Sequence, residues 1–290
     1  MQTFHIYSES TELQSVVIGT SRQFRADQSY VEYINKKQID TKPPTEEVLH
    51  SELQGFRDVL ISRGIEVFIP TAIGSFVPDQ LTPRDIGFII GDKLVISNMS
   101  CSSRRYEVFG ILETIKLFDL SDKKVLIPDA DVWIEGGDVI VDKNCIYLGQ
   151  SNRTNKNGLD FIRRHFSRDF DVFPITVNDH ANESRFLHLD CVFNPVGSSH
   201  ALFFRDGVID IPDRVLKNYE IIEIDEYEQA ELATNILTIS SETVIVRKSE
   251  KLNRVNTLLK AHYDVIEIDF SSVVATGGSL RCASLPLIRK

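Results

Sequence analysis

A cysteine, a histidine and several acidic residues stand in this chain where turns lead into apolar segments. Cys282 follows the pair Gly277-Gly278, which lets the backbone turn tightly and lets a ligand approach closely. Alone, this segment equally fits a turn and a buried cysteine in a last strand, because free cysteines are usually core residues. His188 and Asp190 begin an apolar run, and on one strand they would share a face, which is costly in apolar surroundings unless both are paired. A thiol with a histidine nearby indicates nucleophilic catalysis.

Acidic residues mark two further turns of the same kind. Asp85 follows Arg84 and precedes an apolar run, and Glu135 and Asp138 bracket a glycine pair before another apolar run. Taken singly, each fits a structural role: a capped or paired turn for the acids, and a core position for the histidine. The whole set is harder to explain as structure than any one member.

The combination of a thiol with several carboxylates indicates the kind of substrate. Carboxylates would repel a developing oxyanion, so the set does not suit ordinary acyl transfer. They suit a planar cation, because a guanidinium offers a fixed fork of N–H donors that carboxylates accept in pairs. Such a cation beside Cys282 would also lower the pKa of the thiol and favour the thiolate.

A repeated arrangement of strands and helices has to bring these residues together. Units of roughly 50 residues follow one another, each with apolar strands, a helix and a short final strand. We expect the helices near residues 45–63, 103–118, 155–167, 212–218 and 250–261. The pattern predicts one domain over residues 1–290, a five-bladed α/β propeller with small sheets toward the middle and helices outside.

The chemical residues recur at similar strand-start positions of successive units. In a ring, such positions meet at one mouth, so we expect the acids, the histidine and the thiol to lie close together. We expect an apolar strand over Leu189–Phe193 in the fourth unit, and we expect Thr276–Cys282 to close the fifth.

Five motifs in this order over residues 84–282 carry a resemblance to a known superfamily: Arg84-Asp85, Glu135-Gly-Gly-Asp138, Arg153-Thr-Asn155, His188-Leu-Asp190 and Gly277-Gly-Ser-Leu-Arg-Cys282. They resemble the guanidino-group-modifying enzymes, which include arginine deiminases, dimethylarginine dimethylaminohydrolases, arginine dihydrolases and amidinotransferases. The resemblance implies the pentein fold, a five-module α/β propeller, in agreement with the repeat pattern.

The resemblance also implies a role for each catalytic residue. Cys282 would attack the guanidinium carbon and form a covalent thiouronium. His188 would protonate the leaving nitrogen and then activate water or an acceptor amine. Glu135 would orient His188 and the substrate.

Four further residues would bind the substrate, according to the same resemblance. Asp85 and Asp190 would grip the guanidinium nitrogens, and Arg104 and Arg153 would hold the substrate α-carboxylate. Taken singly, either arginine also fits a solvated position on a helix or loop.

The motifs leave the reaction open within the superfamily. The His188-Leu-Asp190 triplet is more similar to deiminases, dihydrolases and amidinotransferases than to dimethylarginine hydrolases, and favours an unsubstituted guanidinium. Our first hypothesis is a hydrolase of L-arginine or a close analogue, giving citrulline or ornithine plus ammonia. The second is an amidinotransferase that moves the amidino group to an amine, and the third is a non-catalytic module that binds arginine.

Composition narrows the class of protein and of partner. The 290 residues carry a net charge of -10, which opposes nucleic acid and anionic membranes but not a small cation. We expect no metal and no cofactor, because the four cysteines and the His188-Asp190 pair lack a second ligand pair. The cysteine usage and the absence of a signal sequence or long apolar run predict a cytoplasmic protein. A homodimer is our expectation for its assembly.

Overall fold

Fifteen strands form five small sheets in the computed structural model, which describes residues 1–25, 43–74, 77, 79–121, 124–178 and 186–290. In every sheet the middle strand pairs antiparallel with the first strand and parallel with the third. In this order, the sheets are β15 (Ser284–Arg289), β1 (Leu13–Ile18) and β2 (Glu66–Phe68); β3 (Gly87–Ile90), β4 (Lys93–Ile96) and β5 (Val125–Leu126); β6 (Val139–Asp142), β7 (Cys145–Gln150) and β8 (Asp171–Thr176); β9 (Phe193–Val196), β10 (His200–Phe203) and β11 (Glu220–Glu223); and β12 (Leu237–Thr238), β13 (Thr243–Arg247) and β14 (Asp264–Ile268).

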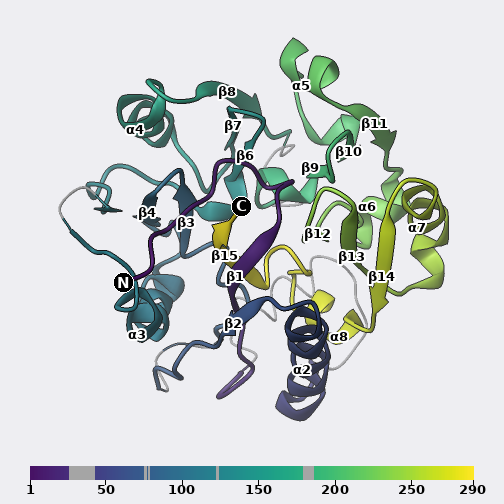
Figure 1. Cartoon of the computed structure of the whole chain (residues 1–290), viewed down its shortest axis with the longest axis horizontal. Coiled ribbons are helices and arrows are strands. Elements are labelled where there is room, and N and C mark those ends of the chain that lie inside the picture. Colours follow the sequence, from purple (N-terminus) through teal and green to yellow (C-terminus); the bar gives the residue numbers. More distant parts are fainter. Residues whose placement is uncertain (26–42, 75–76, 78, 122–123, 179–185) are drawn as a thin grey trace.

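Helices lie at the rim of a ring of sheets, as Figure 1 shows for α2, α4, α5 and α7. The α-helices of the described residues are α2 (Glu46–Ser62), α3 (Leu112–Ile115), α4 (Lys156–Phe166), α5 (Asp213–Asn218), α6 (Glu226–Ala230), α7 (Asn253–Lys260) and α8 (Ser271–Val274). None of them is long and apolar enough to cross a bilayer. The predicted five-bladed α/β propeller is confirmed.

The ring is closed by a strand from the far end of the chain. Strand β15 pairs antiparallel with β1, with Val17 opposite Leu285 and Ile18 opposite Ser284. The segment that carries Cys282 therefore leads into the first sheet, and the expectation that it closes the fifth unit is wrong. The fifth sheet is already complete with β12, β13 and β14.

The helix expected near 103–118 is replaced by three short pieces. Two 3-10 turns, η1 (Ser102–Arg104) and η2 (Glu107–Ile111), precede the four-residue α3. Tertiary contacts are close here, since Gly110 packs on Gln80 so that a Cβ would lie 2.2 Å from its side-chain nitrogen.

The strand expected over Leu189–Phe193 is also wrong. Residues Leu189–Cys191 form the 3-10 turn η5, and β9 begins only at Phe193. The backbone N–H of Leu189 donates to the Asp138 carboxylate at 2.8 Å, which fixes a turn at this point. His188 and Asp190 therefore do not share a strand face.

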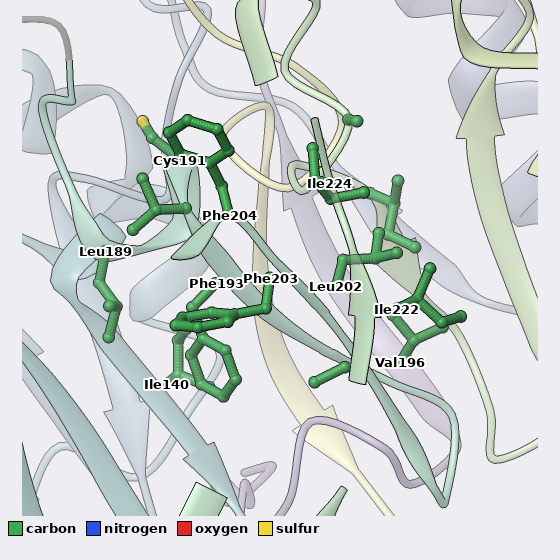
Figure 2. Packing of buried hydrophobic residues seen from close by; sticks show 14 of the residues in the cluster. Ile140, Leu189, Cys191, Phe193, Val196, Leu202, Phe203, Phe204, Ile222 and Ile224 are labelled. Carbon is green, nitrogen blue, oxygen red and sulfur yellow. The ribbon is translucent and has the colours of Figure 1, made fainter. Parts of the chain in front are cut away.

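The apolar core lies between neighbouring sheets. Phe193 of β9 packs edge-on against Phe203 of β10, with ring centroids 5.9 Å apart, and against Tyr147 of β7 at 5.4 Å. Figure 2 shows Phe193 and Phe203 together, with Ile140 of β6 beside them. Neighbouring sheets are thus joined through a shared apolar core.

Candidate active site

Polar residues stand just ahead of the first strand of every sheet. They lie one to three positions before β3, β6, β9, β12 and β15, and they are Asp85, Asp138, Asp190, Asn235 and Cys282. The fold brings these strand starts together: Asn235 bonds to Cys282, and the carboxylates of Asp85 and Asp190 are near enough to act on its thiol.

The Cys282 thiol is buried, with 5% of the residue exposed. Its Sγ receives a hydrogen bond from Asn235 Nδ2 at 3.0 Å and lies 3.8 Å from Asp190 Oδ2. Burial raises the pKa of the Cys282 thiol well above its ordinary value, and the negative charges of Asp190 and Asp85 raise it further. Without a cation nearby, Cys282 is therefore a thiol at neutral pH.

The glycine pair before Cys282 is required by geometry. Gly277 has φ +101°, a left-handed conformation that favours glycine. A Cβ on Gly278 would lie 2.6 Å from the Thr82 methyl group and 3.2 Å from the Cys282 Cβ. This close turn also brings the backbone of Ser279 to the sulfur, where its hydrogen bond lowers the pKa of the thiol.

His188 and Glu135 form a buried hydrogen-bonded pair. His188 Nε2 lies 2.8 Å from Glu135 Oε2, while Ser100 donates its backbone N–H and its hydroxyl to Glu135 Oε1, each at 2.9 Å. Burial opposes both charges, but their attraction prevails and lowers the pKa of Glu135 to about 2. Burial likewise opposes the charge of His188, but Asp85, Glu135 and Asp138 together raise its pKa to about 9. His188 is therefore protonated at neutral pH.

Asp85 has one occupied and one open carboxylate oxygen. Its Oδ2 accepts a hydrogen bond from Arg104 at 2.7 Å. Its buried Oδ1 lies 3.7 Å from His188 Nδ1 and has no hydrogen-bond partner among the residues that the structure describes. The alternative pairing with Arg84 is not formed, because Arg84 lies near Glu9 instead, at 3.8 Å.

Asp190 is fully buried and bound to an arginine. Arg281 donates to Asp190 Oδ2 at 2.8 Å and to both oxygens of Glu9, at 2.8 and 3.2 Å. This ion pair fixes the carboxylate beside the Cys282 sulfur and offsets part of its charge.

Asp138 bonds to the backbone beside His188 and to two hydroxyl groups. Its Oδ2 accepts from Ser151 at 2.6 Å and Thr154 at 2.7 Å, and its Oδ1 accepts from the Leu189 backbone next to His188. Burial raises the pKa of Asp138 to about 6 in spite of these bonds. The Glu135-to-Asp138 turn therefore supplies one carboxylate to the His188 ring and another to the backbone N–H of the next residue, Leu189.

The two predicted carboxylate-binding arginines differ in their partners. Arg104 donates to both oxygens of Glu107, at 2.8 and 3.0 Å, as well as to Asp85 and Thr82. Arg153 Nη1 lies 3.7 Å from Glu135 Oε2, and about a quarter (23%) of its side chain is exposed. Arg153 is thus the more available of the two.

Asn235 contacts Cys282 directly, and the sequence prediction missed it. It occupies, before β12, the position that Asp85, Asp190 and Cys282 occupy in other sheets. The five-fold repeat would have pointed to it, had every strand start been compared. Glu9 was missed as well, and no repeat signals it, since it precedes β1 and not a sheet's first strand.

A sequence model of a known family matches most of this chain. The family is described as N,N dimethylarginine dimethylhydrolase, eukaryotic, and the match covers residues 20–289. The chain belongs to this family. The predicted relation to guanidino-group-modifying enzymes is thereby confirmed.

This member of the dimethylarginine hydrolase family has relatives of two kinds: uncharacterised proteins and enzymes that modify guanidino groups. The protein YkgA of Bacillus subtilis, which is uncharacterised, is 34% identical over 284 residues, covering 97% of this chain and 89% of its own. An arginine deiminase of Bacillus cereus strain ATCC 10987 is 24% identical, covering 74% of this chain and 62% of the deiminase.

Solved structures share the fold at lower identity. The amidinotransferase SxtG of Microseira wollei superposes with a TM-score of 0.81 at 20% identity, covering 99% of this chain and 97% of its own. A dimethylarginine dimethylaminohydrolase of Pseudomonas aeruginosa in complex with citrulline gives 0.75 at 19% identity, covering 95% and 99%. Both likenesses support the five-module propeller.

Proposed function

We propose that the chain is a cysteine-dependent hydrolase of a guanidinium group, acting on L-arginine or a close analogue. The reaction would pass through a covalent thiouronium on Cys282 and give citrulline or ornithine plus ammonia. An N-methylated arginine, to which the family description points, counts among the analogues and would release the methylated amine.

The open oxygen of Asp85 is the observation that carries the proposal. A buried carboxylate oxygen without a hydrogen-bond partner in the described residues, 3.7 Å from His188, is costly unless a ligand donates to it. A guanidinium N–H is a suitable donor, and Asp190 would receive others beside the sulfur.

Binding of the cation would start the chemistry. Its positive charge offsets the negative charges of Asp85 and Asp190, which lowers the pKa of the Cys282 thiol, so that the thiol loses its proton to solvent. The sulfur would then attack the guanidinium carbon, forming a C–S bond and a tetrahedral centre. His188, protonated at neutral pH, would donate its proton to the leaving nitrogen as the C–N bond breaks.

The second half of the reaction would use the same histidine as a base. Neutral His188 would take a proton from water, the hydroxide would add to the thiouronium carbon, and the C–S bond would break to return the thiolate. Glu135 would keep the imidazole oriented through its 2.8 Å hydrogen bond. Citrulline and one ammonia result from one such hydrolysis. Ornithine would require a second hydrolysis, in which water attacks the ureido carbon and this carbon leaves as carbon dioxide with a second ammonia.

Arg153 would be the main contact of the substrate carboxylate. Arg104 already donates to Asp85 and Glu107, so its first role would be to fix the orientation of Asp85. An arginine near the mouth with about a quarter of its side chain exposed can still form a charged pair with a carboxylate.

Mass spectrometry of products would test the proposal. The purified protein is incubated with L-arginine and, separately, with dimethylarginine, each with and without glycine as an amine acceptor. Citrulline or ornithine formed without glycine is expected, and Cys282→Ala should remove it. A new guanidino compound that appears only with glycine would instead support the amidinotransferase, and saturable arginine binding without turnover would support the non-catalytic module.

A further inference from the structure

The side-chain amide of Asn235 contacts Cys282 at two atoms. Its Oδ1 accepts a hydrogen bond from the Cys282 backbone N–H at 3.0 Å, and its Nδ2 donates to the Cys282 sulfur at 3.0 Å. Because the backbone N–H can only donate, the amide oxygen must face it. The NH2 group is therefore oriented toward the sulfur without ambiguity.

The backbone around Asn235 is fixed by a hydrogen bond within its own turn and by hydrogen bonds from the neighbouring strand β9. Its backbone N–H donates to the Leu232 carbonyl at 3.0 Å, and Leu232 adopts φ +57°, an uncommon conformation that costs energy in a residue with a side chain. Asn194 of β9 donates to the carbonyls of Thr234 and Ile236, at 2.7 and 3.1 Å. A strained turn and a bond from the neighbouring sheet thus fix the residue that faces the sulfur.

We propose that Asn235 is a positioning residue for the Cys282 nucleophile: its amide holds the sulfur in one orientation and supplies an N–H donor to the negative charge that forms there. This role rests on the proposed function, in which the sulfur attacks the substrate.

The surroundings of the sulfur explain why such a donor is needed. Asp190 lies 3.8 Å away and opposes the formation of a thiolate. A neutral N–H donor favours the thiolate without adding a positive charge, so it does not compete with a guanidinium for the open oxygen of Asp85. A lysine or arginine at this position would compete with the substrate cation.

Two substitutions separate the contacts of the amide. Asn235→Asp keeps an oxygen for the Cys282 N–H but replaces the donor at the sulfur with a second carboxylate oxygen. Asn235→Ala removes both contacts. The readout is the rate of alkylation of Cys282 by iodoacetamide over a range of pH, measured on the Cys282 peptide by mass spectrometry.

We expect the alkylation midpoint of Asn235→Asp to move up by about one pH unit or more, which is about a tenfold slower reaction at a fixed lower pH. Asn235→Ala should shift the midpoint less, and should lower kcat while leaving KM for the turned-over substrate nearly unchanged. If Asn235→Asp does not fold, the midpoint of Asn235→Ala carries the test.

Asn256→Asp is the matched control. Asn256 is also buried, but it lies in α7 and donates to the Arg247 carbonyl and to Glu267. It should lose stability on thermal unfolding without moving the alkylation midpoint of Cys282.

An unchanged midpoint in both folded Asn235 variants would overturn the positioning role. The assay needs no substrate, so it also separates this inference from the proposed function. A shifted midpoint in a protein that turns over no guanidine would retain the contact between Asn235 and the sulfur and reject the hydrolase.

Discussion

The proton of His188 depends on the carboxylates around it. Glu135 bonds directly to Nε2 at 2.8 Å, and Asp85 lies 3.7 Å from Nδ1. A folded-state pKa of about 9 lies above the ordinary histidine value, so the proton is retained through neutral pH and lost as the pH rises through about 9. The imidazole is thus prepared to act first as an acid.

Glu135→Gln should weaken this acid. The amide removes a negative charge, so the pKa of His188 should fall toward its ordinary value and the alkaline limb of kcat should move to lower pH. We also expect kcat to fall by about a hundredfold or more, a typical loss for acid–base catalysis. Glu267→Gln, at a surface pair with Lys260, should leave the pH profile unchanged. If the alkaline limb of kcat does not move in Glu135→Gln, Glu135 does not raise the pKa of His188.

The pH dependence of the unchanged enzyme should differ between kcat/KM and kcat. In the free protein Cys282 is a thiol, so kcat/KM should rise from neutral pH to about pH 9, where His188 begins to lose its proton. In the complex the substrate cation lowers the pKa of the thiol, so the acid limb of kcat should lie at lower pH. Steady-state kinetics over this range measures both limbs; coincident acid limbs would contradict activation by the substrate.

For single residues, the sequence predicted which side chains gather at the site better than it predicted their hydrogen-bond partners. The thiol, His188 and the acids were found because their joint chemistry fits a guanidinium. The bond from Arg281 to Asp190 joins residues 91 positions apart, and no local pattern encodes it. Asn235 escaped notice because an asparagine before a strand is common in turns.

The short turns before β6 and β15 bring the backbone into close contact with the predicted catalytic side chains. A Cβ on Gly137 would lie 2.6 Å from the His188 ring and 3.0 Å from Asp85 Oδ1. The 3-10 turn η3 (Gly136–Asp138) therefore requires glycine where the imidazole lies.

Gly137→Ala should displace His188 and reduce kcat by about a hundredfold or more, since a shift of about 1 Å has this effect. Gly55→Ala is the matched control, because Gly55 lies in α2 with nothing within 4 Å of an added Cβ. That change should raise the free energy of unfolding by about 0.5–1 kcal/mol and leave activity intact. Activity is measured alongside chemical denaturation. Full activity in Gly137→Ala would show that catalysis does not depend on the observed position of the His188 imidazole.

Helices and strands were predicted correctly where an apolar periodic pattern packs on a core. They were predicted wrongly where a side chain bonds to the backbone and stabilises a turn. The helix α2 buries Leu49, Leu53, Phe56 and Leu60 as its spacing indicates. The expected helix near 103–118 is broken into short turns where Arg104 bonds to Glu107. The segment after His188 follows the Asp138 carboxylate, which no strand pattern contains.

The whole molecule depends on the pairing between β1 and β15. Leu285 is fully buried in the cluster that joins the first and second sheets. Leu285→Ala should lower the free energy of unfolding by about 2–5 kcal/mol, whereas Leu216→Ala, at a half-exposed position of α5, should change it little. Urea denaturation followed by circular dichroism compares the two; equal stabilities would mean that the ring does not depend on this strand.

The repeat pattern predicted the ring but not which strand closes it. Each unit reads as complete along the chain, and nothing in an apolar run of six residues indicates a partner more than 250 positions away. Only the pairing of β15 with β1 reveals that the first sheet takes a strand from the far end of the chain.

This closure has a consequence for synthesis of the protein on the ribosome. The first sheet lacks a strand, and the nucleophile lacks its neighbours, until residues 284–289 have left the exit tunnel. A nascent chain can therefore pair the strands of its middle sheets early but cannot complete the surroundings of Cys282 until the last strand is available. Chains that terminate prematurely before β15 would lack the strand that closes the ring.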